Sequence, residues 1–355
     1  MLKPLFAALL AALALAAPLA GSAQTRPAGP RWTLVVHGGA GVIERARMSP
    51  ERDRAYRAAM NAALDRGSAV LARGGSSLDA IEAVIEGMED DPLFNAGRGA
   101  VFTASGTNEL DASIMDGATL KAGAVAGVTT VRYPIALARA VMDRSPHVMM
   151  IGEGAETFAA TQNLERVPPA FFFTERRWQD LERVMGERGQ PMPARPAGAP
   201  PAPAGPRAAV EDVTHRFGTV GVVAVDTRGN VAAGTSTGGT TGKRWGRVGD
   251  APIIGAGTYA SNRSCAVSAT GTGEYFIRLT VAREVCALVE HRGMALQQAA
   301  DEVVQRRLRE IGGDGGIIAV TPDGTPAWSF NTSGMYRARA NAAGERLVAI
   351  YADER

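Results

Sequence analysis

Thr219 is the residue of this chain whose surroundings most clearly suggest chemistry. It precedes an apolar run, residues 220–225, that predicts a buried strand and ends at the turn signal of residues 226–230. Directly upstream, the stretch QPMPARPAGAPPAPAGPRAA is too rich in Pro, Ala and Gly to bury a core. A cut between Gly218 and Thr219 would free an N-terminal threonine, which carries both a hydroxyl nucleophile and an α-amine of pKa about 8 that can serve as its base. The alternative interpretation is a strand that merely follows a linker.

Threonine and glycine recur together downstream of Thr219, at the ends of apolar segments. Glycine permits positive φ and close backbone approach to a ligand, and threonine supplies a hydroxyl that can donate or accept. The segments are residues 232–239 (AAGTSTGG), 246–252 (GRVGDAP), 255–260 (GAGTYA) and 268–274 (SATGTGE).

Together with motifs in the N-terminal half, these segments resemble the plant-type L-asparaginases and isoaspartyl peptidases of the N-terminal-nucleophile hydrolase superfamily. The matching N-terminal motifs are residues 35–41 (VVHGGAG), 91–103 (DPLFNAGRGAVFT), 109–117 (ELDASIMDG) and 121–125 (KAGAV). The resemblance runs from about residue 34 to the C-terminus, except for the Pro-rich insert. It implies an α+β fold, the four-layer αββα sandwich of that superfamily, and activation by self-cleavage.

The resemblance also implies the catalytic residues. It places the cleavage site at Gly218 and Thr219, where the Thr219 hydroxyl would attack the Gly218 carbonyl and hydrolysis of the ester would free the α-amine. Thr237 matches a second threonine that hydrogen-bonds near the nucleophile; the alternative is a strand-end threonine that caps its own turn. Thr270 and Gly271 match an oxyanion hole made of one hydroxyl and one backbone N–H.

Arg247 and Asp250 carry the argument about substrate. A guanidinium can grip an α-carboxylate bidentately while a nearby carboxylate holds an α-ammonium, so the pair can bind the zwitterionic end of an L-aspartyl group. The alternative is a surface ion pair. Gly273 matches a position in the resembled family whose backbone contacts the substrate amino group. Asn95 matches a family residue that lies near the active site. The implied substrates are L-asparagine and β-aspartyl (isoaspartyl) dipeptides.

Residues 88–98 resemble the family's sodium loop, in which backbone carbonyls bind a structural Na⁺. The implied ligands are Met88, Glu89, Asp91, Phe94, Ala96 and Arg98. No catalytic metal or other cofactor is expected, because the four histidines are scattered and the chain has neither HExxH nor paired-cysteine spacing. His37, within a matched motif, is interpreted as a structural histidine.

The length of 355 residues and the hydrophobic content of 46% allow one large domain or two small ones. One Lys, an apolar run over residues 5–19 and small residues before Gln24 predict a signal peptide, residues 1–23, and an exported protein that is periplasmic or secreted. The apolar run is short for a membrane span. A formal charge of +2 favours neither nucleic acid nor an anionic membrane as partner. The resemblance implies a dimer of αβ heterodimers.

Two cysteines, Cys265 and Cys286, are too few for a disulfide framework. Cys265 falls in a strand-like segment and Cys286 in a helical one, so we expect burial as two small hydrophobic side chains. A bridge formed in an oxidising compartment is the alternative.

The elements that must position these residues occur in long blocks, which favours layered packing over a doubly wound sheet. Helices are expected over residues 52–64, 78–88, 133–142, 152–161, 275–289 and 295–311. Strands are expected over residues 33–39, 109–115, 122–128, 316–320, 326–331 and 346–351, with several short ones in 218–275. The α-subunit would span residues 24–218, with a Pro/Ala-rich linker over about 190–209 that becomes a loose tail after cleavage. The β-subunit would span residues 219–355, and the two subunits would form one folded unit.

The sequence therefore predicts an exported, self-cleaving threonine hydrolase of β-aspartyl dipeptides and L-asparagine. One alternative is a glycosylasparaginase-like amidase, disfavoured by the motif over residues 93–103 and by Gly, not Asp, before the nucleophile. The other is a periplasmic binding protein for aspartyl ligands that is never cleaved; it would gain nothing from the pair Gly218 and Thr219.

Overall fold

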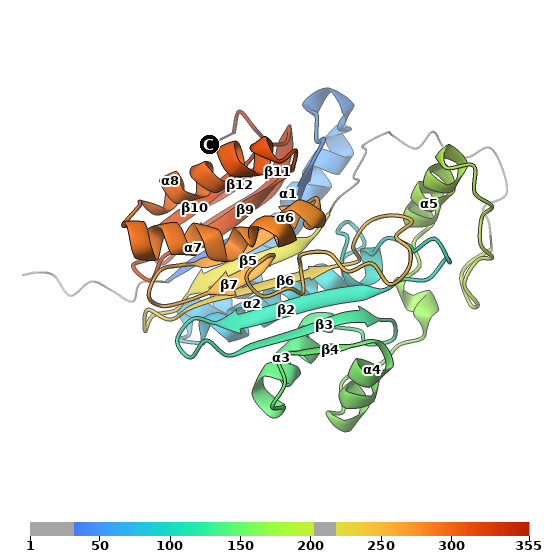
Figure 1. The fold of residues 1–355 in the computed structure, drawn as a ribbon, viewed down its shortest axis with the longest axis horizontal. Coiled ribbons are helices and arrows are strands. Elements are labelled where there is room, and N and C mark those ends of the chain that lie inside the picture. Colours follow the sequence, from blue (N-terminus) through green and yellow to red (C-terminus); the bar gives the residue numbers. More distant parts are fainter. Residues whose placement is uncertain (1–31, 202–217, 355) are drawn as a thin grey trace, which may run out of the picture.

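The computed structural model describes residues 32–201 and 218–354, which fold into four layers (Figure 1). Two β-sheets pack face to face, and helices cover the outer face of each sheet. The predicted αββα sandwich is confirmed. The predicted signal peptide lies outside the described residues.

The larger sheet has eight strands in the order β12–β11–β1–β5–β6–β2–β3–β4. Its pairs are antiparallel except for β3 and β4, which run parallel. The strands are β1 (Thr33–Gly41), β2 (Leu110–Asp116), β3 (Ala122–Val128), β4 (Met149–Ile151), β5 (Val220–Val225), β6 (Val231–Thr237), β11 (Gly334–Asn341) and β12 (Arg346–Tyr351). The strand that follows the expected cleavage site, β5, therefore lies in the middle of the sheet, between β1 and β6.

The smaller sheet has the order β10–β9–β8–β7. Its strands are β7 (Thr258–Ala260), β8 (Ala266–Gly271), β9 (Gly315–Val320) and β10 (Pro326–Phe330). Apolar side chains of both sheets interdigitate between them, among them Val35, Val223 and Ile318. This inner core holds β8 against β5 and β6, and so brings the Thr270 segment over the Thr219 segment.

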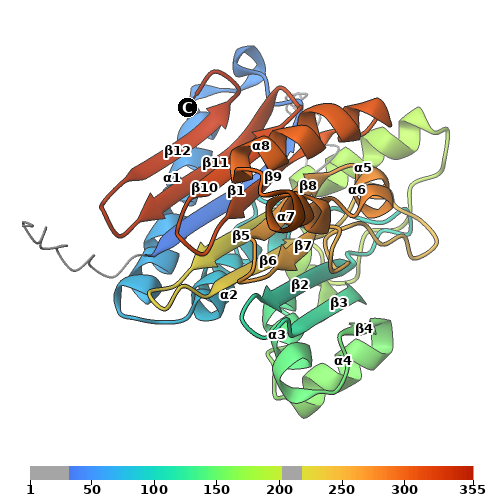
Figure 2. The same cartoon turned by 60° about the vertical axis from the view of Figure 1, so that its left-hand side comes forward.

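Helices form the two outer layers (Figures 1 and 2). On the larger sheet lie α1 (Pro50–Ala72), α2 (Ser77–Glu89), α3 (Pro134–Arg144) and α4 (Gly152–Thr161). On the smaller sheet lie α6 (Gly273–Leu279), α7 (Val281–Arg292), α8 (Leu296–Asp301) and the π-helix η4 (Glu302–Leu308). Short 3-10 turns are η1 (Arg45–Arg47), η2 (Gly97–Gly99) and η3 (Pro169–Phe172). Helix α5 (Glu175–Glu187) packs at one side through the aromatic cluster of Phe102, Phe173 and Trp178. None of the described helices is both long and apolar enough to cross a membrane.

The sequence did not predict β4, α5 or β11. In α5 the buried side chains Trp178, Leu181 and Met185 form an apolar stripe that charged neighbours conceal in the sequence. In β11 the apolar pattern is interrupted by Arg337. This residue is only 1% exposed and donates to the carbonyls of Met335 and Tyr351. A buried arginine that donates to backbone carbonyls in this way cannot be told from a surface arginine in the sequence.

Three predicted helices have other boundaries. The helix predicted over residues 52–64 begins at Pro50 and continues to Ala72 as α1. The helix predicted over residues 275–289 is in fact two helices, α6 and α7, because Thr280 between them has a φ of +47°. The helix predicted over residues 295–311 begins as α8 and then widens into η4.

The structure describes the first part of the predicted linker, residues 190–201. Residues 190–201 form no helix or strand, but Arg195 pairs with both carboxylate oxygens of Glu175, at 2.8 and 2.9 Å. Its guanidinium also lies over the rings of Phe173 and Trp178. Residues 190–201 are therefore held against α5 in the uncut chain, and residues 202–209 of the predicted linker lie outside the described residues.

The expectation of two separate buried thiols is also wrong. Cys265 and Cys286 form a disulfide, with their Cα atoms 5.4 Å apart, between the start of β8 and the middle of α7. Both residues are fully buried. Only the packing of α7 on β8 reveals the pairing, because the bridge requires a Cα separation that the sequence does not state.

We expect removal of this disulfide to lower the free energy of unfolding by about 3 kcal/mol, because it closes a loop of about 20 residues in the unfolded chain. Urea titrations of the wild type and of the double variant Cys265→Ala/Cys286→Ala measure the difference. Equal urea midpoints for the two proteins would contradict the prediction.

Candidate active site

Thr219 lies directly before β5 and is 8% exposed. Its hydroxyl donates to Thr237 Oγ1 over 3.2 Å. Thr237 ends β6, the strand paired with β5, and the register that places Val220 opposite Ser236 brings the two threonines together across 18 residues of chain. The pairing of two buried strands is thus what creates the hydroxyl pair.

The carbonyl of Gly218 accepts two hydrogen bonds. Thr237 Oγ1 donates to it over 3.1 Å and Asn95 Nδ2 over 2.6 Å. Asn95 is itself fixed, because Nδ2 also donates to the Gly239 carbonyl over 2.8 Å and Oδ1 accepts from the Val101 N–H over 2.9 Å. Two donors therefore polarise the carbonyl that precedes Thr219, and the Thr219 hydroxyl is bonded to one of them.

Gly39, at the irregularity in the register of β1, makes room for this segment. Its φ is +111°, and a Cβ there would lie 3.1 Å from Gly218 Cα and 3.4 Å from Thr219 N. A side chain at position 39 would both strain the backbone and push against the expected cleavage site.

Arg247 and Asp250 converge over Gly273. A Cβ on Gly273 would lie 2.8 Å from Asp250 Oδ1 and 3.0 Å from Arg247 Nη2, so the missing side chain leaves open the space that both charged groups face. A Cβ on Gly239 would lie 3.4 Å from Arg247 Nη1, and the Gly239 N–H donates to Thr237 Oγ1 over 3.0 Å. The charged pair thus adjoins the threonine pair.

Asp250 is 5% exposed, and its Oδ2 has no hydrogen-bond partner among the described residues. Burial raises the pKa of Asp250 to about 7, and Arg247 only partly opposes this effect. Arg247 is held instead by Glu274, whose carboxylate accepts from Nε and Nη2 at 2.9 and 3.0 Å. The carboxylate of Asp250 is therefore left for a cation that the described residues do not supply.

Thr270 and Gly271 end β8, on the facing sheet. Thr270 is fully buried, and its Oγ1 has no partner among the described residues. Ser268 shares its face, because side chains of a strand alternate, and a Cβ on Gly221 of β5 would clash with Ser268 Oγ. An unpartnered hydroxyl is therefore placed on the face of β8 that packs against the strand of Thr219.

A chain of buried hydroxyls crosses the interface between the sheets. His37 Nε2 bonds Ser268 Oγ at 2.9 Å, and Ser268 bonds Thr235 at 2.7 Å. Thr235 bonds Thr258, and Ser113 bonds both Thr258 and the Ala251 carbonyl. Burial lowers the pKa of His37 to about 3, and the Thr219 backbone opposes this only in part. A pKa this low leaves the His37 ring uncharged near pH 7.

Residues 88–98 fold back on themselves. Gly97 has a φ of +48°, and a Cβ there would clash with the Glu89 carbonyl, as a Cβ on Gly99 would with the Phe94 carbonyl. The fold of the loop thus depends on close approach to the carbonyls of Glu89 and Phe94, which are two of the predicted Na⁺ ligands. Carbonyl oxygens are suitable ligands for a hard cation. The described residues contain no group of three or more His, Cys, Asp or Glu side chains that could hold a metal.

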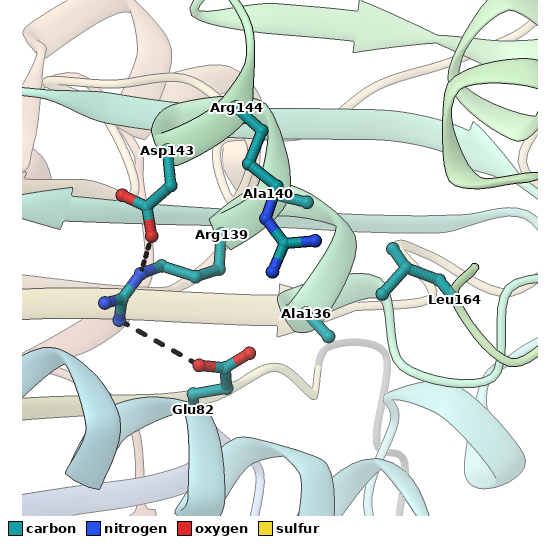
Figure 3. Close-up of a pocket in the computed structure, with 7 residues that line it drawn as sticks. All are labelled: Glu82, Ala136, Arg139, Ala140, Asp143, Arg144 and Leu164. Carbon is teal, nitrogen blue, oxygen red and sulfur yellow. Dashed lines mark hydrogen bonds and ion pairs between the residues drawn. The ribbon is translucent and has the colours of Figure 1, made fainter. Parts of the chain in front are cut away.

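A separate hollow of about 220 Å³ lies between α2 and α3 (Figure 3). Arg139 crosses it, pairing with Asp143 at 2.5 Å and with Glu82 at 3.9 Å. None of the predicted site residues lines this hollow.

Sequence reasoning missed Glu274 and the hydroxyl chain. Glu274 directly follows Gly273, so an acid at the end of the Thr-Gly motif was an available signal. For Ser113, Thr235 and Ser268, the signal was a hydroxyl residue inside a buried strand, which requires a polar partner in the core.

The comparison with protein families decides the relationship. The family described as asparaginase matches residues 30–350 of the chain. The chain belongs to the asparaginase family. The match includes every predicted site residue and lies outside the predicted signal peptide.

Curated relatives are similar to this chain over most of their length. The isoaspartyl peptidase of Salmonella typhimurium is 49% identical over 320 residues, covering 90% of this chain and 98% of the relative. The isoaspartyl peptidase of Escherichia coli is 48% identical, with coverage of 90% and 96%. The isoaspartyl peptidase/L-asparaginase of Homo sapiens is 39% identical, with coverage of 85% and 91%.

Proposed function

We propose that this protein is a self-cleaving threonine hydrolase that acts on β-aspartyl dipeptides and L-asparagine. The observation that carries the proposal is the arrangement at Gly218 and Thr219: a hydroxyl bonded to Thr237, beside a carbonyl that accepts from Thr237 and Asn95. The names of the relatives, isoaspartyl peptidase and isoaspartyl peptidase/L-asparaginase, support the choice of substrate.

Self-cleavage would begin at the polarised carbonyl. The Thr219 oxygen attacks the Gly218 carbonyl carbon, the new C–O bond replaces the peptide C–N bond, and the hydroxyl proton passes to the Thr219 nitrogen. Water then hydrolyses the ester, which leaves a carboxylate on Gly218 and restores the Thr219 hydroxyl. The hydrogen bonds from Asn95 and Thr237 favour the first step, because they stabilise negative charge as it develops on the oxygen.

Turnover of substrate would use the same hydroxyl with the freed α-amine as its base. Arg247 would bind the α-carboxylate and Asp250 the α-ammonium, in the space above Gly273. The Thr270 hydroxyl, which has no partner in the described part of the chain, and the Gly271 N–H would stabilise the oxyanion, at about 2.7–4 kcal/mol per donor. The leaving group takes the amine proton and departs as ammonia or an amino acid, and water hydrolyses the acyl-enzyme.

Two alternatives are less well supported. The comparisons do not favour a glycosylasparaginase-like amidase, since the relatives described above carry other names. A binding protein for aspartyl ligands would need Arg247 and Asp250 but not the bonds between Thr219, Thr237 and Gly218.

A structural Na⁺ belongs to the proposal, held by the carbonyls of the loop that Gly97 and Gly99 allow to close. The ion would fix the loop that carries Asn95, and take no part in bond making. A melting temperature that is the same in sodium chloride and in choline chloride would count against this ion.

Export and assembly as a dimer of αβ heterodimers are further parts of the proposal. The disulfide between Cys265 and Cys286 supports export, because such bridges persist mainly in oxidising compartments. Cell fractionation tests the location, and light scattering of the purified protein tests the assembly.

The experiment that tests the activity is intact-mass measurement and N-terminal sequencing, followed by assays with L-asparagine and a β-aspartyl dipeptide. We expect a fragment that begins Thr-Val-Gly-Val and release of ammonia or of an amino acid. A chain that stays whole after prolonged incubation, yet binds L-aspartate, would favour the binding-protein alternative.

A further inference from the structure

A hollow of about 310 Å³ lies beside the charged pair, and no step proposed so far uses it. It opens between two loops, residues 103–109 and residues 243–246. Backbone bonds join these loops, from Ala104 N–H to the Lys243 carbonyl at 2.9 Å and from Gly242 N–H to the Phe102 carbonyl at 2.8 Å. The hollow is therefore a fixed part of the fold.

The hollow borders the proposed active site through Gly239. Lys243 is one of the residues that line the hollow, and its buried Nζ lies 3.3 Å from the Cβ position of Gly239. Arg247 Nη1 lies 3.4 Å from the same point. The Gly239 carbonyl accepts from the Asn95 amide that also holds the Gly218 carbonyl. A substrate bound by Arg247 would thus have the hollow within reach of its remaining part.

Trp245 forms the outer wall and is unusual in two ways. It is 91% exposed, and its φ is +57°, a conformation that L side chains rarely adopt. The Arg247 N–H donates to the Arg244 carbonyl over 3.0 Å, so Trp245 lies in the same tight turn as Arg247. A strained backbone that presents a large apolar ring to solvent points to a function for that ring.

Among the described residues that line the hollow, one cation has no carboxylate partner. Lys243 is neutralised by the Glu109 carboxylate at 3.6 Å and the Asp111 carboxylate at 3.9 Å. Arg244 has no carboxylate partner among the described residues, and its guanidinium lies 4.4 Å from the centre of the Trp245 ring. The hollow thus offers a guanidinium for a carboxylate and an indole face for an apolar side chain.

We propose that this hollow is the subsite for the leaving amino acid of a β-aspartyl dipeptide, with a preference for aromatic or large aliphatic side chains. Arg244 binds the C-terminal carboxylate of that amino acid and Trp245 its side chain. The inference rests on the proposed function, because it places the β-aspartyl half between Thr219 and Arg247. The leaving group of L-asparagine is ammonia, which is too small to reach the subsite.

The test compares kcat/KM for L-asparagine, β-aspartyl-glycine and β-aspartyl-phenylalanine in the wild type, Trp245→Ala and Arg244→Gln. The matched control is Leu120→Ala, which removes a side chain that is 54% exposed, at a φ of +61°, on a turn outside the hollow. We expect Trp245→Ala to lower kcat/KM for β-aspartyl-phenylalanine about tenfold and to leave L-asparagine within about twofold. Arg244→Gln should lower kcat/KM for both dipeptides and leave kcat/KM for L-asparagine unchanged. Leu120→Ala should change kcat/KM for none of the three substrates.

Three results would overturn the subsite. The first is an equal loss of kcat/KM on all three substrates, and the second is no loss of kcat/KM on either dipeptide. The third is an equal loss on all three substrates together with a change from dimer to monomer in Trp245→Ala, which would mean that the Trp245 ring lies at an interface between copies. In each of these cases wild-type hydrolysis of L-asparagine would leave the proposed function standing. A wild type that hydrolyses none of the substrates would overturn both.

Discussion

The variant Thr219→Ala is expected to remain a single uncut chain. Its activity on L-asparagine and on β-aspartyl dipeptides should be at least about 10⁴-fold lower than that of the wild type, as is found when other hydrolases lose their nucleophile. The Thr219 hydroxyl is the atom that would attack the Gly218 carbonyl, and alanine removes it while keeping the backbone of β5 in place. Denaturing gel electrophoresis and intact mass report the cut, and ammonia release reports the activity.

Two variants separate chemistry from folding in this experiment. Thr219→Ser keeps a hydroxyl and should still be cut, whereas Thr227→Ala alters an exposed turn threonine at the other end of β5 and should behave as the wild type. A Thr219→Ala protein that is cut directly after Gly218, in buffer that contains no protease, would contradict the proposed self-cleavage.

Asp250→Asn is expected to lose about 10²- to 10³-fold in kcat/KM while gaining stability. The loss follows because the α-ammonium of the substrate would lose its charged partner. The gain follows because burial raises the pKa of Asp250 from 3.8 to about 7, which corresponds to about 4 kcal/mol of unfavourable free energy when the carboxylate must ionise. We expect the Tm at pH 8 to rise by about 5 °C or more.

The contribution of Asp250 to the free energy of unfolding depends on pH. Above about pH 4 the unfolded chain releases the proton of Asp250, whereas the folded protein keeps it until about pH 7. Folding therefore becomes less favourable as the pH rises from about 4 to about 7, and the contribution is constant above that. The Tm advantage of Asp250→Asn over the wild type should therefore shrink toward pH 4.5. An advantage that is the same at every pH would refute the assigned cause.

The same ionisation predicts the acid limb of the activity profile. Substrate binding needs the Asp250 carboxylate, and attack needs the neutral Thr219 amine, so kcat/KM should fall as the pH drops below about 7–8. The assay is kcat/KM for L-asparagine between pH 5 and 9. Constant activity down to pH 5.5 would show that neither group titrates as proposed.

The chain by itself determined the family and the layered fold, and it singled out the expected cleavage site. These features are written in short, local patterns: an apolar run behind Thr219, Gly-rich turns, and motifs such as DPLFNAGRGAVFT. Each such signal needs only neighbouring residues, because strand alternation, turn chemistry and linker composition act over a few positions. For this reason the central strand β5 and its first residue were predicted correctly.

Only the tertiary structure decided which distant groups meet and how far each is buried. The bridge between Cys265 and Cys286, the burial that raises the pKa of Asp250, and the hydrogen bonds that Arg247 donates to Glu274 all arise between elements that pack together. The same holds for the pairing of Arg195 with Glu175, which docks the first part of the predicted linker on α5 in the uncut chain. Desolvation and pairing depend on the atoms that surround a group in space, and a sequence lists only the residues beside it in the chain.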